Sequence, residues 1–411
     1  MQMEEIEKKE RRDGFWLGYL VALATLLAVG VVWWLIFRPV IILNEDASGL
    51  TSSQMRTLLE KENGMIRRIQ NEYILEDLTN EELMDGAYQG IMDVLDDKYA
   101  DYYDKEEFEK IRRHTDGSYG GIGITLTNDW EIVGVAENGP AQEAGIRTGD
   151  IIRKVQGIVI ADSDLSLEEL QAQLKGSIGD VKTMTLYRPS TDTEYDVELT
   201  LQEIVTQTVF WHMLDQEIAY LQITAFDKVT QEQFNTAWQE IQESGAMKGL
   251  VLDLRGNLGG NLDTVISIAN TLVPKGLIAY TEDKAGNREE YYSEGEGCGV
   301  PMAVLVNEYS ASASELLCGA LKDRGVAKVV GVTTYGKGIV QTTWSLSDGT
   351  AYKMTTGKYY TPNGVNIQGT GIEPDIYIDL TEEQHQMEEV PEDEDMQLQT
   401  AIEAVRTELG S

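Results

Sequence analysis

The hydrophobic residues of this chain gather first in one long run near its start. Residues 15–37 form 23 consecutive positions without a charged side chain. A bilayer core requires about 20 apolar residues in a helix, so the run predicts a transmembrane anchor. Four basic residues lie within 8–12 and few follow the run, which places residues 1–14 in the cytoplasm and the rest of the chain outside the cell membrane. A cleaved signal peptide is the alternative, although its apolar region usually has only about 7–15 residues.

The hydrophobic pattern then divides the outer part into segments. Residues 45–114 have a helical pattern, in which Thr79 is the expected N-cap of one helix and Glu82 completes a capping box. Residues 115–203 contain short alternating strands and two small helices, which indicates a compact domain. Residues 204–380 alternate buried strands with amphipathic helices. The expected fold class is therefore α/β, arranged in several domains.

The last segment and the composition narrow the class of protein. Residues 381–411 begin with an acidic stretch, expected to be a solvated linker, and end in a predicted helix over 396–409. The 411 residues include 70 acidic and 33 basic side chains, a net charge of −37, which argues against a nucleic-acid partner. Cys298 and Cys318 are too few for a disulfide framework, and we expect two unpaired thiols rather than one bridge.

Three serines occupy alternate positions where a buried strand turns into a helix: Ser310, Ser312 and Ser314. A hydroxyl at such a junction lies beside free amides of the helix N-terminus, which suit a developing oxyanion. A serine is a poor nucleophile unless a base takes its proton. The chain has three histidines, which lie in unrelated segments and are expected to be surface or packing residues: His114, His212 and His385. The base is therefore expected to be another residue.

Lys337 is the candidate base. It lies between two glycines and among β-branched residues, and burial would lower its pKa toward neutrality. Lysine replaces histidine in known Ser–Lys pairs. On an extended strand, Gln341 would share a face with Lys337 and could aim its amine. Two alternatives stay open: an ordinary exposed lysine in a turn, and a phosphate loop over 331–338, which has Gly338 where such loops require Ser or Thr.

A glycine-rich stretch, GGIGI, covers residues 120–124. Its backbone can direct successive amides at a carboxylate, and the following strand edge can accept an extended peptide. Together with GPAQEAGIRTGDII and the helix expected over 165–174, it makes residues 115–203 resemble a PDZ domain of the bacterial type. This resemblance implies that a peptide tail binds at Gly121, Ile122, Gly123 and Ile124, with both isoleucines lining the pocket for an apolar last side chain. The alternative is a purely structural turn.

A second resemblance covers about residues 50–380. The segments VNEYSASASELLCGALKDRG and VVGVTTYGKGIVQ resemble the carboxyl-terminal processing proteases, also called tail-specific proteases. LVLDLRGNLGGNLDTVISIAN and YYTPNGVNIQGTGIEPDI are similar to further segments of that family. The resemblance implies a crotonase-like α/β core in which Ser312 is the nucleophile, Lys337 the base and Gln341 the partner of the lysine.

The resemblance also implies an oxyanion hole formed by the amide of Ala313 and that of either Gly259 or Gly260. Two positions depart from the family pattern. Leu258 stands where proline is common, and Lys175 stands where many relatives have arginine. Because lysine cannot make the two-pronged contact of arginine, a regulatory contact at that position is in doubt.

The function expected from the sequence is that of a membrane-anchored, extracytoplasmic serine endopeptidase. It would capture protein or peptide substrates with apolar C-termini through its PDZ domain, and it would require no metal or cofactor. The terminal helical segments, 50–113 and 396–409, could support a homodimer. A non-catalytic PDZ-based receptor for protein tails is the alternative function. An acyl-CoA enzyme on a related core does not suit a location outside the cell.

Overall fold

The computed structural model describes residues 49–136, 139–163, 166–176, 178–215, 217–387 and 390–410. The predicted cytoplasmic N-terminus and anchor lie outside these residues. Within the described ranges, no helix combines the length and the apolar character needed to cross a bilayer. The chain divides into two compact units between Met84 and Asp85.

The first unit holds helix α3 (Ser52–Glu72) and the beginning of α4 (Asn80–Asp93). None of the residues of α3 is buried. The predicted capping box of α4 is present: the Glu82 amide donates to Thr79 Oγ1 at 3.2 Å, and the Thr79 amide donates to Glu82 Oε2 at 2.7 Å. This confirms the predicted start of α4, because both side chains satisfy amides that the helix leaves unpaired.

The second unit begins with the rest of α4 and continues into a short strand that the helical pattern did not predict. Strand β1 (Asp101–Tyr103) pairs with a distant strand, β18 (Ala351–Tyr360), and helix α5 (Lys105–Asp116) follows it. Three residues are too few to show an alternating pattern, so the sequence gives no local signal for β1.

The next segment is the compact domain expected at 115–203. Its hydrophobic core includes Ile132, Ile152, Leu186 and Leu201, all of them fully or almost fully buried. The elements are β2 (Ser118–Gly121), β3 (Ile124–Leu126), β4 (Ile132–Val135), α6 (Pro140–Glu143), β5 (Ile151–Val155), β6 (Ile158–Val159), η1 (Ile160–Asp162), α7 (Leu167–Leu174), β7 (Val181–Arg188), β8 (Thr193–Thr200) and β9 (Gln202–Val205). Strands β6-β5-β7-β8 form one sheet, and β3 pairs with β4.

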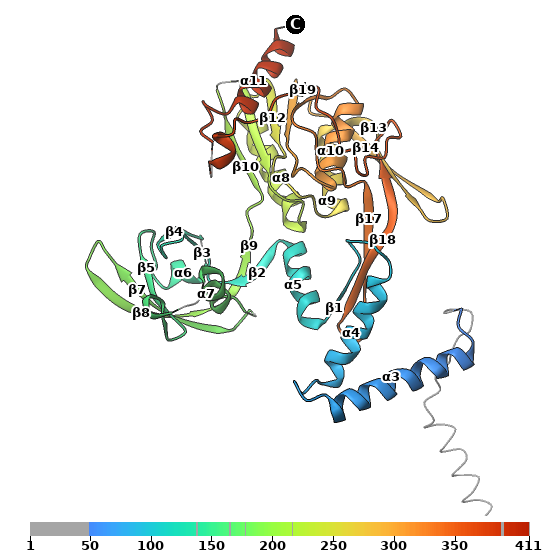
Figure 1. Ribbon diagram of the computed structural model, residues 1–411. Coiled ribbons are helices and arrows are strands. Elements are labelled where there is room, and N and C mark those ends of the chain that lie inside the picture. Colours follow the sequence, from blue (N-terminus) through green and yellow to red (C-terminus); the bar gives the residue numbers. More distant parts are fainter. Residues whose placement is uncertain are drawn as a thin grey trace, which may run out of the picture. The chain divides into compact units, whose positions relative to one another are not determined.

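A six-stranded sheet forms the centre of the following α/β layers (Figure 1). Its strands, in spatial order, are β10 (Val209–Met213), β11 (Ile218–Ile223), β12 (Gly249–Asp253), β15 (Met302–Val306), β16 (Ala327–Gly331) and β19 (Ile376–Tyr377). Strand β10 is antiparallel to β11, and the others run parallel. The carboxyl ends of β12, β15 and β16 therefore meet at one edge, where loops can bring distant residues together.

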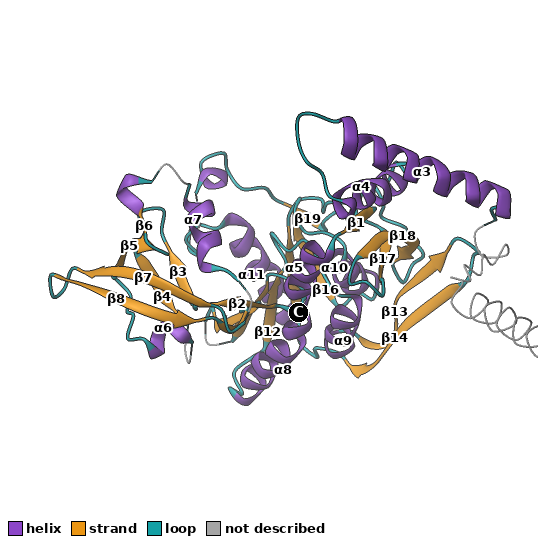
Figure 2. Ribbon diagram, turned by 90° about the horizontal axis from the view of Figure 1, so that it is seen from below, coloured by secondary structure: helices purple, strands orange, loops and turns teal. Residues whose placement is uncertain are grey.

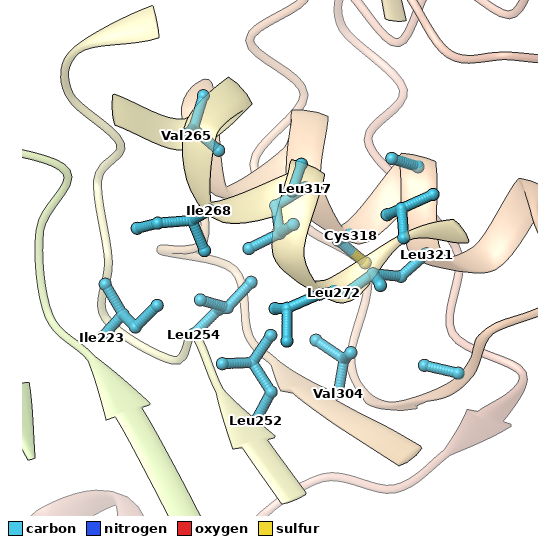
Figure 3. Close-up of a cluster of buried hydrophobic side chains, with 14 of the residues drawn as sticks. Ile223, Leu252, Leu254, Val265, Ile268, Leu272, Val304, Leu317, Cys318 and Leu321 are labelled. Atoms are coloured by element: carbon cyan, nitrogen blue, oxygen red, sulfur yellow. The ribbon is translucent and has the colours of Figure 1, made fainter. Parts of the chain in front are cut away.

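The two faces of this sheet are covered by different helices. Leu252 and Val304 belong to a buried cluster that includes side chains of α8 (Lys228–Glu243), α9 (Leu262–Leu272) and α10 (Ala313–Asp323). Figure 3 shows the two residues beneath labelled side chains of α9 and α10. Val251 and Leu305, which alternate with them, pack against α11 (Met396–Leu409) on the other face. Because the apolar side of α11 is buried in the core, the expectation that this helix could support a homodimer is not supported.

A second sheet has the order β1-β18-β13-β14, with β17 also paired to β18 (Figures 1 and 2). It contains β13 (Pro274–Asp283), β14 (Arg288–Glu296), β17 (Ile339–Ser345) and β18 (Ala351–Tyr360). The loop that carries Lys337 enters this sheet directly, at the start of β17.

The acidic stretch and the two cysteines can also be compared with their predictions. The acidic stretch after residue 381 contains a turn of 3₁₀ helix, η2 (Gln384–Gln386), and most of its described side chains are exposed. Asp395 is the exception, because it is 4% exposed and bonded to Arg255 Nη1 at 2.8 Å.

Cys298 and Cys318 are both buried and unpaired, as predicted, and burial raises the pKa of the Cys298 thiol to about 11.

Candidate active site

Only one of the three alternate serines faces a pocket. Ser310 and Ser314 are fully buried, and their hydroxyls donate to the carbonyl oxygens of Leu254 and Asn257, each at 2.8 Å. Ser312 lies between them at the start of α10, with φ +55° and ψ −112°. Such a conformation costs a non-glycine residue about 1–3 kcal/mol, so the surrounding hydrogen bonds must hold it. Ser310 and Ser314 therefore support the turn that presents Ser312.

Asn257, fully buried, connects this turn to the glycine loop after β12. Its side chain donates to the Ile223 carbonyl at 2.8 Å, and its own carbonyl accepts the Ala311 amide at 3.0 Å. The Asn257 side-chain oxygen accepts the amide of Gly259 at 2.9 Å. Asn257 was not predicted from the sequence, although a polar residue in the loop four positions after a buried strand was a usable signal.

The bond to Asn257 distinguishes the two glycines proposed for an oxyanion hole. The Gly259 amide is occupied by Asn257, and its Cα packs so closely that an added Cβ would lie 2.9 Å from the Ala313 nitrogen. Among the described residues, neither the Gly260 amide nor the Ala313 amide has a hydrogen-bond acceptor. Gly260 and Ala313 also line the same pocket as Ser312, whereas Gly259 does not. The geometry thus favours Gly260 as the second donor.

Lys337 reaches this pocket from the loop between β16 and β17. Gly336 has φ +87°, and a Cβ at Gly338 would lie 2.6 Å from the Gln368 nitrogen. Both flanking positions therefore require glycine, which agrees with the close backbone approach predicted from the sequence. A strand rather than a helix follows the loop, which also removes the phosphate-loop alternative.

The environment of Lys337 lowers the pKa of its amine. Burial is the main cause, and the positive charges of Lys353 and Lys98 act in the same direction. The Nζ atom lies 4.6 Å from the centroid of the Tyr99 ring. Ser312 and Lys337 line one pocket of about 490 Å³, but no hydrogen bond joins them in the described part of the chain.

Gln341 lines the pocket but is not bonded to Lys337 in the described part of the chain. Its Nε2 atom instead lies 3.5 Å from Thr355 Oγ1, at the limit of a hydrogen bond. The two side chains line the same pocket, as a common face would place them, but the strand between them is irregular. Strand β17 begins at Ile339, and a register shift between Val340 and Gln341 breaks the alternation that the prediction assumed.

Glu315 is the functional residue whose importance the sequence analysis missed. Its fully buried side chain accepts four hydrogen bonds of 2.6–2.8 Å. The donors are the amides of Ser312, Gly336 and Lys337 and the hydroxyl of Thr334. A carboxylate with this many donors is a strong and rigid connection.

Tyr359 supports the same turn from β18. Its hydroxyl donates to the Ser312 carbonyl at 3.0 Å, and burial raises the pKa of Tyr359 well above its usual value. The hydroxyl therefore stays a hydrogen-bond donor at neutral pH. The pocket beside it is lined by apolar side chains: Leu258, Leu262, Leu316, Ile339 and Val340.

A second pocket, of about 270 Å³, lies in the segment expected to bind peptide tails. The four residues named from the sequence, Gly121, Ile122, Gly123 and Ile124, all line it. Helix α7 contributes Gln171 and Leu174 to the other side, and Lys175 follows. In the described part of the chain, β3 pairs with β4 alone, so its other edge is open to an added strand.

The histidines lie elsewhere. His212 Nε2 is 2.8 Å from Glu392, and His385 Nε2 is 3.0 Å from Asp379. Neither lines the Ser312 pocket, and the side chain of His114 lies outside the described part. The described residues contain no group of three or more metal-ligating side chains.

Comparison with known proteins gives consistent matches. Residues 217–378 match Peptidase family S41, and residues 131–188 match the PDZ domain family. The chain is 35% identical over 309 residues to a carboxy-terminal-processing protease of Bartonella bacilliformis, covering 73% of this chain and 70% of the relative. It is 34% identical over 340 residues to the carboxy-terminal processing protease CtpB of Bacillus subtilis, covering 81% and 70%.

Among solved structures, the photosystem II D1 C-terminal processing protease matches with 29% identity and a TM-score of 0.48, covering 80% of this chain and 94% of that structure. The identity and the coverage of the two bacterial relatives decide the assignment. The chain belongs to the carboxy-terminal processing proteases of peptidase family S41, and it is a serine-type endopeptidase.

Proposed function

We propose that this endopeptidase is anchored in the cell membrane, binds the C-terminal tails of proteins in its PDZ groove and cleaves them with Ser312 and Lys337. One observation carries the catalytic part. The pocket that holds Ser312 and Lys337 also contains two amides without acceptors in the described part, those of Gly260 and Ala313.

The chemical steps follow from these four groups. Neutral Lys337 takes the proton from Ser312 Oγ, which attacks the peptide carbonyl carbon. The amides of Gly260 and Ala313 stabilise the resulting oxyanion, an effect worth about 3–4 kcal/mol for a single donor. Protonated Lys337 then gives its proton to the leaving amine as the C–N bond breaks. Water attacks the acyl-enzyme as Lys337 accepts its proton. The bond between Ser312 Oγ and the acyl carbon then breaks, Lys337 returns the proton to Oγ, and the new carboxyl terminus is released.

The proposal requires Lys337 and Ser312 to come within hydrogen-bond distance when substrate is bound. Catalytic contacts are often long in the absence of substrate and shorten in the complex, so the separation seen here is compatible with the mechanism. Gln341, which lines the same pocket, would then serve as a polar partner for the amine.

The groove between β3 and α7 supports recognition of a protein tail. An extended peptide would pair with the open edge of β3, and its apolar last side chain would enter between Ile122, Ile124 and Leu174. The amides of the glycine-rich turn would hold the terminal carboxylate. Lys175, at the same groove, supplies a positive charge near that carboxylate.

Anchoring is proposed from the apolar residues 15–37 and the basic residues before them, a pattern that favours a protease domain outside the cytoplasm. A homodimer is proposed through the N-terminal helical segment. Leu58, Leu59 and Met65 of α3 are exposed, and they offer an apolar surface for this contact.

The experiment uses the full chain in detergent micelles and an unstructured test protein with an apolar C-terminal tail. The wild type should cleave it, and Ser312→Ala should bind it without cleavage. A test protein with the same sequence but an acidic tail should be cleaved more slowly, with the change mainly in KM. Cleavage by Lys337→Ala at the wild-type rate would remove the proposed base.

The alternative is a non-catalytic receptor that only binds tails. It would be supported if the wild type bound the apolar tail with the affinity of Ser312→Ala but never cleaved it. The presence of Ser312, Lys337 and two available amides in one pocket favours the protease.

A further inference from the structure

Lys337 has a second set of contacts outside the proposed catalytic groups. The segment between α4 and β1 places Tyr99 beside the lysine, with the Nζ atom 4.6 Å from the ring centroid. Lys98 Nζ lies 4.8 Å from the same centroid and donates to the Tyr335 hydroxyl at 3.0 Å. Two ammonium groups therefore share one aromatic ring, although like charges repel each other.

The position of Tyr99 is fixed by backbone hydrogen bonds. Asp97 Oδ1 accepts the Tyr99 amide at 3.0 Å, and Asp97 Oδ2 accepts the Thr355 amide of β18 at 3.2 Å. Burial alone would raise the pKa of Asp97, but these hydrogen bonds and the charge of Lys353 lower it overall, so the carboxylate stays ionised. The ring is thus held to the strand that pairs with β17, directly after the Lys337 loop.

We propose that Tyr99 is a positioning residue that holds the Lys337 ammonium on its ring, away from the Ser312 hydroxyl, in the resting enzyme. The inference rests on the proposed function, because it takes Lys337 as the base. It goes further because Tyr99, which is far in sequence from Ser312 and Lys337, would control when the base is available.

The physical reason is the difference between the two forms of the amine. The negative face of an aromatic ring attracts a cation, whereas a neutral amine gains little from it. The contact with Tyr99 therefore favours the protonated, inactive form and weakens when the proton is lost. Loss of the proton and release from the ring are coupled, and only the released amine can reach Ser312.

Other charged or titratable groups also act on the lysine, and they come from every element packed around it: Lys353 of β18, Tyr335 of its own loop, Lys98 of the segment before β1 and Glu315 of α10. The two lysines disfavour the protonated form, and Glu315 and Tyr335 favour it. These four groups act on the ammonium through their charges. Among the described residues, only Tyr99 offers it the face of an aromatic ring.

The test measures how fast a fluorophosphonate probe labels Ser312 in the full chain, over a range of pH. Tyr99→Leu keeps an apolar side chain but removes the ring, and it should label about two- to tenfold faster near neutral pH. The labelling rate should rise with pH as Lys337 loses its proton, and this rising part of the profile is the acid limb. In Tyr99→Leu the acid limb should move to lower pH, because the protonated lysine has lost a stabilising contact. Tyr99→Phe, which keeps the ring, should restore the wild-type limb.

A matched control is Tyr88→Leu in α4, an exposed tyrosine whose ring lies at a tilt against the ring of Tyr102, with centroids 5.3 Å apart. Its labelling rate and pH profile should equal those of the wild type. Tyr99→Trp strengthens the ring contact and should move the limb the opposite way, to higher pH. It keeps the test decisive if Tyr99→Leu fails to fold.

Two results would overturn the inference: an unchanged limb in both folded Tyr99→Leu and Tyr99→Trp, or slower labelling of folded Tyr99→Leu. Failure of the proposed function has a different signature, namely wild-type labelling of Lys337→Ala. If Lys337→Ala is inactive and Tyr99→Leu behaves as the wild type, only the role of Tyr99 is refuted.

Discussion

The backbone amides of Ser312 and Lys337 donate to the same oxygen, Oε2 of Glu315, each at 2.8 Å. The other oxygen accepts the Gly336 amide at 2.7 Å and the Thr334 hydroxyl at 2.6 Å. One buried carboxylate therefore fixes the serine turn and the lysine loop relative to each other, through their main chains. These bonds engage the main chains of both residues, while the Lys337 amine lies separately beside the Tyr99 ring.

Glu315→Gln should separate these two loops. The glutamine has the same shape, but its NH₂ group would face amides that need an acceptor, and at least two donors would be left unpaired. A buried unpaired donor costs about 1–3 kcal/mol. We expect a loss of about 3 kcal/mol in the free energy of unfolding and a fall in kcat of at least about 100-fold. Urea unfolding and steady-state kinetics with the apolar-tailed test protein would measure both.

Glu308→Gln is the matched control, because Glu308 lies in the connection between β15 and α10, four residues before Ser312, but is exposed. It should change neither the stability nor kcat by more than experimental error. Normal kcat in Glu315→Gln would show that the carboxylate does not align the two loops.

Much of the fold follows from local periodicity. The predicted bounds of α11, residues 396–409, agree with the structure. Ser312 and Lys337 come together for a simple topological reason: their loops follow β15 and β16, which are parallel neighbours. The sequence pattern of two buried strands, each ending in small residues, was therefore informative about the site as well as the fold.

The missed features all depend on contacts between segments far apart in the chain. Tyr99 comes from a short connection with no periodic pattern, and the register shift before Gln341 has no local signal. The four bonds of Glu315 could not be distinguished in the sequence from an ordinary helix cap. Asp395 was interpreted as part of a solvated linker because its acidic neighbours are solvated, and its partner, Arg255, is distant in sequence.

Gly260→Ala should test the oxyanion hole. Gly260 has φ +145°, and a Cβ would collide with the carbonyl oxygen of Phe226, so the loop and its amide must move. Losing one oxyanion donor costs about 100- to 1,000-fold in kcat, and KM should change little. Gly256→Ala is the control in the same loop, since it also has positive φ, +71°, but no atoms lie within 4 Å of an added Cβ. Equal effects of the two substitutions on kcat would indicate general strain rather than a lost donor.

Asp395→Asn should loosen the C-terminal helix. Asp395 accepts the Leu398 amide at 3.0 Å as the N-cap of α11, and it pairs with the buried Arg255 at 2.8 Å. Replacing the carboxylate weakens a charged hydrogen bond, so we expect a loss of about 2 kcal/mol in the free energy of unfolding. Asp393→Asn, at an exposed position, should leave the urea midpoint unchanged. A wild-type midpoint for Asp395→Asn would mean that α11 is held by its apolar face alone.

Lys353→Met should change the pH dependence of the enzyme. The positive charge of Lys353 is one cause of the lowered pKa of Lys337, second to burial, so removing it should raise that pKa. Because the neutral amine is the active form, kcat/KM rises as the pH increases through the Lys337 pKa. The acid limb of kcat/KM should therefore move to higher pH in the variant. A charge interaction of about 1 kcal/mol corresponds to about a fivefold loss near neutral pH, with recovery at alkaline pH.

Lys358→Met removes a charge from the same strand at an exposed position and should keep the wild-type profile. Both variants remove one positive charge from β18, so they differ in where that charge lies and not in how much charge is lost. Only Lys353 lines the pocket with Lys337, so a specific electrostatic effect must appear in Lys353→Met alone. An acid limb at lower pH in Lys353→Met, or an equal shift in both variants, would contradict Lys337 as a base tuned by its neighbour.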